Sequence, residues 1–270
     1  MCTVTFIARR NGYALGMNRD EKFTRITGLS PRLTHFKGRT ILAPSEPGGG
    51  TWIGVNDTGA TLALINWYSI TSRVIGQTVS RGEVVKLALP SDSPALVEAT
   101  LNELPLARVN PFRLIGVFPS GKSVVEWRWN LQRLERRHHR WRTNRWISSG
   151  FDEPGAQRTR GKAFGEALRQ TSAETTDWLR RLHRSHRPRC GPYSTCMHRG
   201  DAATVSYSEI TVSRQMANLR YAPGALCCTA PLPALRLELK RRPLPPNYFF
   251  GSIAISPFLW HARGLANARA

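Results

Sequence analysis

The stretch CTVTFIARRNGYALGMNRDE at residues 2–21 decides the fold expected for this chain. Residues 2–8 alternate and are rich in β-branched side chains, a pattern typical of a strand with one buried face. Asn11 and Gly12 form the residue pair that a type I′ turn prefers, because both of its central positions need a positive φ. Residues 13–19 read as the returning strand. We therefore expect an antiparallel hairpin at the start of the chain.

The hairpin register predicts which side chains meet. If Asn11 and Gly12 form the turn, the numbers of paired residues sum to 23, so that Cys2 faces Glu21. Arg19 then lies on the same face as Cys2, diagonal to it, where its guanidinium would stabilise a thiolate. Asp20 points to the other face unless a bulge at the strand end turns it back. The alternative is that residues 18–21 are only the polar end of a strand.

Cys2 is the strongest candidate for a nucleophile. Removal of the initiator methionine would leave its thiol and a free α-amino group on one residue. An α-amine has a pKa of about 7.7–8.0, so it can accept the proton of the thiol without a separate histidine. The thiol then needs only a modest lowering of its pKa to ionise near neutral pH.

The rest of the chain alternates strand-rich and helix-rich segments. Strands are expected at 51–56, 61–69, 113–118, 123–129, 204–212 and 235–240, and helices at 84–89, 95–104, 160–169 and 174–186. This order predicts an α+β fold in which helix pairs cover stacked antiparallel sheets. We expect one domain over residues 1–240 and a poorly defined C-terminal extension over 241–270. The glycines at 48–50 favour a close backbone approach near the mouth of the site.

The charge balance raises the question of nucleic acid. Lys and Arg number 39 against 18 Asp and Glu, a net charge of +21. The densest basic run, residues 128–145, has interleaved tryptophans that could stack on bases. No recognised nucleic-acid-binding signature accompanies it, so a solvated strand-and-turn region is favoured. The chain has no run of 18 apolar residues and no secretory leader pattern, which predicts no membrane span and a cytoplasmic location.

The five cysteines do not suggest a framework of disulfides, because their number is odd and no secretion signal precedes them. Cys190, Cys196 and His198 lie close enough in sequence to be candidate metal ligands. Their spacing lacks the paired C-x2-C geometry of zinc modules, so no metal site is expected. A catalytic pair of Cys196 and His198 is also disfavoured, because no oxyanion-binding pattern surrounds it.

Six segments together resemble one protein family. They are MCTVTF at 1–6, MNRDE at 17–21, GGTWIGVNDTGATLALINW at 49–67, SRGEVV at 80–85, WISSGFDEP…RGKAF at 146–164 and CMHRGDAATVS at 196–206. The combination resembles the NRDE family, also called the Transport and Golgi organisation protein 2 family, from residue 1 to about residue 228. That family is similar to N-terminal-nucleophile (Ntn) hydrolases with a four-layer αββα sandwich.

The resemblance implies roles for individual residues. In the cysteine branch of these hydrolases, Cys2 would match the nucleophile, Asp20 the carboxylate that holds the α-amine, and Asn66 a group of the oxyanion hole. Arg19 would replace an arginine that the acylases carry two positions earlier. Asn18, Ser149 and Arg199 are supporting or substrate-binding candidates; Ser149 stands where an asparagine is usual, and Arg199 is the nearest counterpart of a late arginine.

Two main functions of different classes, and a weaker third one, follow from these observations. The first is hydrolysis of a small non-peptide amide or related acyl bond by Cys2, with no cofactor. The second is non-catalytic handling of haem or of acyl-CoA and lipid ligands, which the family resemblance also implies. Arginines could then bind propionates or phosphates, and Cys or His could ligate haem iron. Nucleic-acid binding through residues 128–145 is a weaker third candidate.

Overall fold

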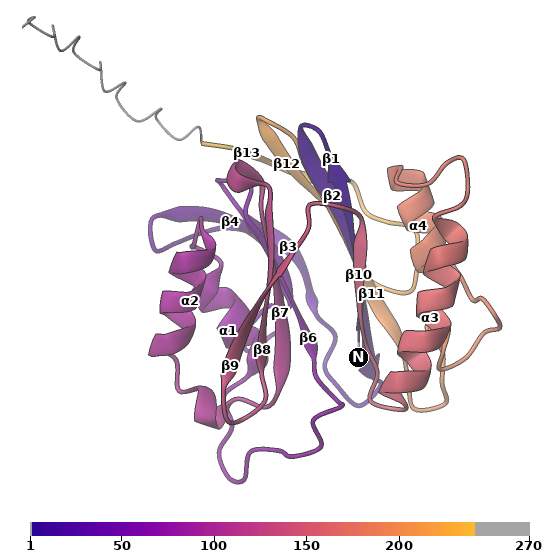
Figure 1. Cartoon of the computed structure of the whole chain (residues 1–270), viewed down its shortest axis with the longest axis horizontal. Helices are drawn as coiled ribbons and strands as arrows, with labels where there is room; N and C mark the ends of the chain where they lie inside the picture. Colours follow the sequence, from indigo (N-terminus) through magenta and orange to yellow (C-terminus); the bar gives the residue numbers. More distant parts are fainter. Residues whose placement is uncertain (1, 241–270) are drawn as a thin grey trace, which may run out of the picture.

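The computed structural model describes residues 2–240, and the expected extension over 241–270 lies outside them. Two antiparallel sheets stack face to face, and a pair of helices covers each outer side (Figure 1). This arrangement is the four-layer α+β sandwich that the sequence predicts. No helix within the described residues combines the length and the hydropathy needed to cross a membrane.

The first sheet has six strands in the order β10-β1-β2-β11-β12-β13. Their bounds are β1 (Cys2–Arg9), β2 (Gly12–Lys22), β10 (Asn144–Ser148), β11 (Ala202–Val212), β12 (Met216–Ala222) and β13 (Leu235–Glu238). Helices α3 (Glu153–Ala167) and α4 (Thr176–Arg184) cover its outer face. The central position of β1 and β2 places the start of the chain inside the sandwich rather than at its edge.

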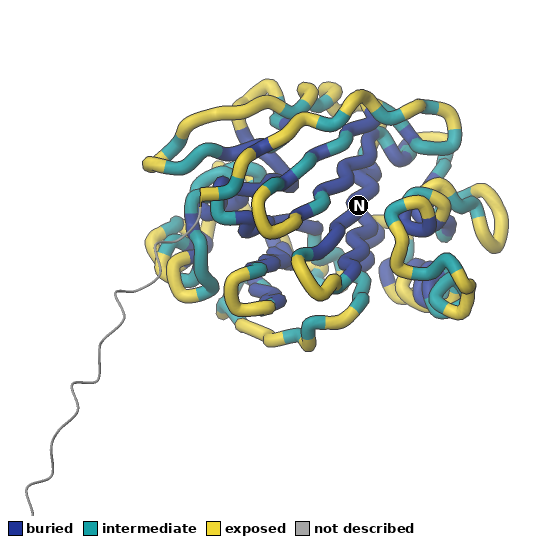
Figure 2. Tube along the Cα trace, turned by 90° about the horizontal axis from the view of Figure 1, so that it is seen from above, coloured by how far each residue is buried: buried dark blue, intermediate teal, exposed yellow. Residues whose placement is uncertain are grey.

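The second sheet has seven strands in their sequence order, from β3 to β9. Their bounds are β3 (Leu29–Phe36), β4 (Arg39–Ser45), β5 (Ile53–Asn56), β6 (Thr61–Asn66), β7 (Phe112–Phe118), β8 (Ser123–Trp129) and β9 (Leu134–His139). Helices α1 (Arg81–Ala88) and α2 (Pro94–Glu103) cover its outer face. The inner faces of the two sheets enclose the main apolar core, in which Phe6 and Met17 pack with Ile65 and Ile115. Figure 2 shows these buried segments at the centre and exposed loops around them.

The helices begin where capping residues stand. Ser80 accepts a hydrogen bond from the Gly82 amide at the start of α1, and Ser93 accepts one from the Leu96 amide at the start of α2. Both starts agree with the sequence. Helix α3 begins seven residues before the expected position, because Asp152 caps the Gly155 amide at 2.9 Å and Pro154 occupies the first turn.

The expected register of the first hairpin is wrong by two residues. Arg9 pairs with Gly12, so the turn residues are Arg10 and Asn11, and Cys2 pairs with Arg19 instead of Glu21. Gly12 has a φ of +134°, and a Cβ there would lie 1.8 Å from the carbonyl oxygen of Val212. Position 12 therefore requires glycine, because any side chain there would collide with the backbone at the end of strand β11. A shift of two residues preserves the face of each side chain, so Arg19 still shares the face of Cys2.

Candidate active site

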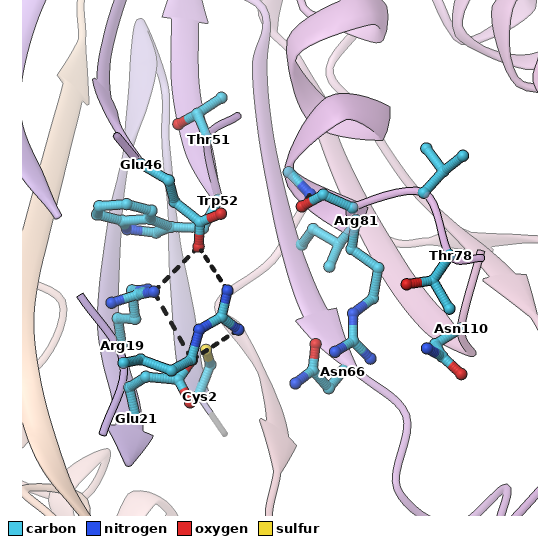
Figure 3. Close-up of a pocket in the computed structure, with 15 residues that line it drawn as sticks. Cys2, Arg19, Glu21, Glu46, Thr51, Trp52, Asn66, Thr78, Arg81 and Asn110 are labelled. Carbon is cyan, nitrogen blue, oxygen red and sulfur yellow. Dashed lines mark hydrogen bonds and ion pairs between the residues drawn. The ribbon is translucent and has the colours of Figure 1, made fainter. Parts of the chain in front are cut away.

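A cavity of about 320 Å³ opens where one end of the first sheet meets the second, and Cys2 lines it. Figure 3 shows two facing walls. Cys2 and Arg19 stand on one side, and Asn66 and Arg81 stand on the other. The close approach expected at the glycines is present beside it: the Thr51 amide donates to the Gly82 carbonyl at 3.1 Å, and Gly50 packs against the same turn of α1.

Cys2 lies between Arg19 and Ser148. It pairs directly with Arg19 of β2 and with Ser148 of β10, and directly paired residues project from the same face of a sheet. The Ser148 hydroxyl is buried and has no hydrogen-bond partner among the described residues. Ser149, which the resemblance suggested as a donor, instead accepts from the Phe151 amide at 3.3 Å. Ser148 is therefore better placed than Ser149 to serve a group bound at Cys2.

Arg19, which lines the cavity on the same side as Cys2, is held in place by several contacts. Its guanidinium carbon lies 4.6 Å from the ring centroid of Trp52, and one terminal nitrogen lies 3.1 Å from Glu46 and 3.6 Å from Glu21. Arg25 pairs with the same two carboxylates. The two arginines and the two glutamates balance one another, which fixes the guanidinium of Arg19 on the Cys2 side.

Burial raises the pKa of the Cys2 thiol, with Asp20 acting in the same direction and Arg19 in the opposite one. A thiol that ionises near neutral pH needs its pKa lowered, and burial acts against this. The reason is that Cys2 is only 7% exposed, so the low dielectric of its surroundings disfavours the thiolate. A thiol in this position needs a nearby base to take its proton as it attacks.

Asp20 lies on the opposite face of β2, toward the helices. Its carboxylate accepts from the Thr204 hydroxyl at 2.7 Å and from Arg160 of α3 at 3.3 Å. Arg160 also donates to the Thr3 hydroxyl at 2.7 Å and is 1% exposed. The bulge found here lies in β11, between Thr204 and Ser206, rather than in β2. Asp20 thus keeps the face that alternation gives it, and it is anchored next to the first residues of β1.

Asn18 fastens the sheet to the helical layer. Its amide donates to the carbonyls of His183 and Thr195, and its oxygen contacts the His183 ring at 3.1 Å. Asn18 supports the fold behind the site and does not line the cavity. Arg199 likewise does not line it; its guanidinium pairs with Asp201 and lies 5.0 Å from the Phe151 ring centroid.

Asn66 and Arg81 come from the second sheet and the helix above it. The Asn66 amide donates to the Tyr68 hydroxyl at 2.8 Å. Arg81, at the first position of α1, donates to the Pro111 carbonyl at 3.3 Å, and burial lowers its pKa. It forms no ion pair with any carboxylate of residues 2–240. The segment SRGEVV at 80–85 was part of the family resemblance, but Arg81 within it was not predicted to be a site residue.

A family model for Transport and Golgi organisation 2 matches residues 1–177, about two thirds of the chain. The chain belongs to the Transport and Golgi organisation 2 family. The match includes every site residue described above except His183, Thr195, Arg199, Asp201 and Thr204, which lie beyond residue 177. No curated protein is significantly similar to the chain in sequence.

The chain is also similar to solved structures of a conjugated bile acid hydrolase and a penicillin V acylase. Two variants of the conjugated bile acid hydrolase from Clostridium perfringens are each 9% identical. One has a TM-score of 0.51 over 88% of this chain and 97% of that chain, and the other has 0.50 over 92% and 100%. Penicillin V acylase from Agrobacterium tumefaciens is 12% identical, with a TM-score of 0.49 over 81% and 82%. Because the sequence identity to the bile acid hydrolase is only 9%, the similarity shows the fold alone, which is of the Ntn-hydrolase type.

Proposed function

We propose that this chain is an Ntn-type hydrolase that cleaves a small non-peptide amide, with Cys2 as its nucleophile. The observation that carries the proposal is the row Arg19, Cys2 and Ser148 on one face, opening into a cavity opposite Asn66. Family membership and the Ntn-type fold support it.

The proposed reaction needs removal of Met1. The α-amine of Cys2 then takes the thiol proton while the sulfur attacks the amide carbonyl. The Ser148 hydroxyl and the Asn66 amide are the proposed donors for the oxyanion, with the fixed guanidinium of Arg19 on the same face as Ser148. The C–N bond breaks as the ammonium returns the proton to the departing amine, which leaves a thioester on Cys2. Water then attacks the thioester, with the amine again as base, and releases the carboxylic acid.

Asp20 is proposed to orient the α-amine. Its carboxylate is anchored by Thr204 and Arg160 and stands beside the first residues of β1. A fixed carboxylate next to a newly formed ammonium stabilises the protonated state that the reaction passes through. The buried Cys2 thiol depends on that base, because burial disfavours its ionisation without one.

The charges of the cavity indicate the class of substrate. Arg19 and Arg25 are balanced by Glu21 and Glu46, whereas Arg81 carries a positive charge that no described carboxylate pairs with. A guanidinium is well matched to a carboxylate or phosphate. We infer that the amide substrate carries an anionic group that reaches Arg81, as in an N-acyl amino acid.

The test is a hydrolysis screen over N-acyl amino acids and their neutral N-acyl amine counterparts, with intact-mass detection of an acyl adduct. The expected result is turnover of anionic members and an acyl adduct confined to Cys2. The proposal would be overturned if protein that lacks Met1 gives neither turnover nor an acyl adduct with any compound of the screen. Haem and acyl-CoA binding stay predictions, as do the cytoplasmic location and the absence of nucleic-acid binding.

A further inference from the structure

A second cluster of reactive side chains lies outside the cavity. His186, Cys196, His198 and Cys227 each offer a ligand atom, and these atoms all lie within 4.8 Å of one another. None of the four lines the cavity around Cys2. The sequence spacing pointed to Cys190 as the partner of Cys196 and His198. Cys190 is exposed and outside the cluster, whereas His186 and Cys227 complete it from the segments after α4 and after β12.

The distances match a tetrahedral metal site. A zinc ion with Zn–S of about 2.3 Å and Zn–N of about 2.0–2.1 Å holds two sulfurs about 3.8 Å apart and a sulfur and a nitrogen about 3.5 Å apart. The Sγ atoms of Cys196 and Cys227 are 3.5 Å apart. The His198 Nε2 atom lies 3.6 Å from the Cys196 sulfur and 3.3 Å from the Cys227 sulfur.

His186 supplies the fourth position. Its Nε2 atom is buried and has no hydrogen-bond partner among the described residues. Its ring meets the His198 ring edge to face, with centroids 5.0 Å apart. A buried ring nitrogen without a partner costs free energy, and a metal ion would satisfy it.

We propose that His186, Cys196, His198 and Cys227 bind one structural zinc ion. Two cysteines and two histidines are a common donor set for closed zinc sites. Binding would release the two thiol protons to solvent, so two thiolates balance the charge of Zn²⁺ and both histidines stay neutral. With four protein ligands the site has no open position for substrate.

The ion would fix the segment between His186 and His198, which contacts the end of β2 that carries Asn18 and Asp20. The segment between His186 and His198 provides the Thr195 carbonyl to Asn18 and the Pro192 carbonyl to Arg160. Met197 in the same segment is bonded to Thr204, whose hydroxyl holds Asp20. The zinc would join this segment to the turn at Cys227.

The test is zinc content per chain, measured by elemental mass spectrometry on reduced full-length protein purified without a histidine tag. We expect about one zinc per chain in the wild type and a background level in the double variant Cys196→Ala/Cys227→Ala. Cys190→Ala is the matched control and should retain the ion. Cys228→Ala should retain it as well, because Cys228 neighbours Cys227 but is not one of the four ligands.

Two further measurements keep the result decisive if the double variant fails to fold. Cobalt added to the metal-free wild type should give the absorption of a tetrahedral thiolate site, and zinc should displace it. Cys227→His should still bind one ion, because it preserves a ligand set. The proposal fails if the reduced wild type takes up neither metal, if a folded double variant binds zinc equally well, or if Cys196 and Cys227 are recovered as a disulfide.

Discussion

Cys2 and Arg19 are directly paired residues of neighbouring antiparallel strands, so the thiol and the guanidinium leave the sheet on one face. The pairing explains why the wrong turn assignment did not misplace the site, since a two-residue shift keeps every face. Trp52 and Glu46 hold the Arg19 guanidinium in place, so the charge on the Cys2 side is already positioned without a ligand.

Replacement of Cys2 should separate chemistry from folding. We expect Cys2→Ser and Cys2→Ala to lose at least about a thousandfold in kcat/KM, because the nucleophile of the covalent step is weakened or absent. The melting temperature should change little for Cys2→Ser, which is nearly isosteric. Hydrolysis of an N-acyl amino acid is the measurement, with Cys190→Ala as the control. Undiminished turnover by Cys2→Ala would assign the activity to another residue.

The buried ion pair of Arg160 and Asp20 should be important for stability. Arg160→Met removes the guanidinium that pairs with the buried Asp20 carboxylate, which should cost about 3–5 kcal/mol of unfolding free energy. Arg158→Met, on the exposed side of the same helix, is the matched control and should change the value by less than about 0.5 kcal/mol. Urea denaturation measures both. Equal effects of the two substitutions would mean that the pair does not anchor Asp20.

His183 should make the fold sensitive to mild acid. Burial, together with the nearby Arg160 charge, lowers its pKa to about 3 from 6.5. The unfolded chain therefore binds this proton first as the pH falls, so the stability due to His183 is present above pH 6.5 and declines below it. Between pH 7 and pH 5 we expect a loss of about 2 kcal/mol that His183→Gln does not show. The measurement is urea unfolding of both proteins at each pH; parallel losses in the two would contradict it.

Arg81 should act on substrate binding more than on turnover. Arg81→Gln is expected to raise KM for an N-acyl amino acid by about tenfold or more, corresponding to loss of one charged hydrogen bond of about 1.5–3 kcal/mol. It should change KM for a neutral N-acyl amine much less. Arg73→Gln, an exposed neighbour outside the cavity, is the control. If Arg81→Gln affects both substrates equally, the proposed anionic group does not contact Arg81.

The sequence predicted the elements that carry strong local signals. Strands β1, β2 and β6 and the capped helices α1 and α2 were expected near their observed bounds. Cys2 and Arg19 were expected on one face from the hairpin, and Asn66, which the family resemblance suggested, lines the same cavity. Strand β10 was not predicted, because it spans only five residues, Asn144–Ser148, and begins at the end of the basic run 128–145 without clear alternation. Its pairing with β1 brings Ser148 beside Cys2, and local sequence carries no sign of that pairing.

Long-range packing accounts for the other residues that sequence reasoning missed. Arg160 meets Asp20 across 140 positions, and Cys227 meets Cys196 across 31. Neither spacing follows a helix or strand period, so neither pair could be inferred from periodicity. Asn18 and Arg199 were predicted as site residues because they belong to motifs that carry the family resemblance. Such motifs also mark structural contacts, as Asn18 shows by bonding to His183 and Thr195.

The central claim is that Cys2 becomes an N-terminal nucleophile, and cysteine alkylation followed by peptide mass spectrometry tests it most directly. The purified chain is treated briefly with iodoacetamide between pH 5 and pH 9, and the modified fraction of each cysteine is measured with the state of Met1. The account predicts that Met1 is absent and that Cys2, though buried, reacts faster than exposed Cys190 near pH 7. Retention of Met1, or a Cys2 that reacts no faster than Cys190 across the whole range, would contradict it.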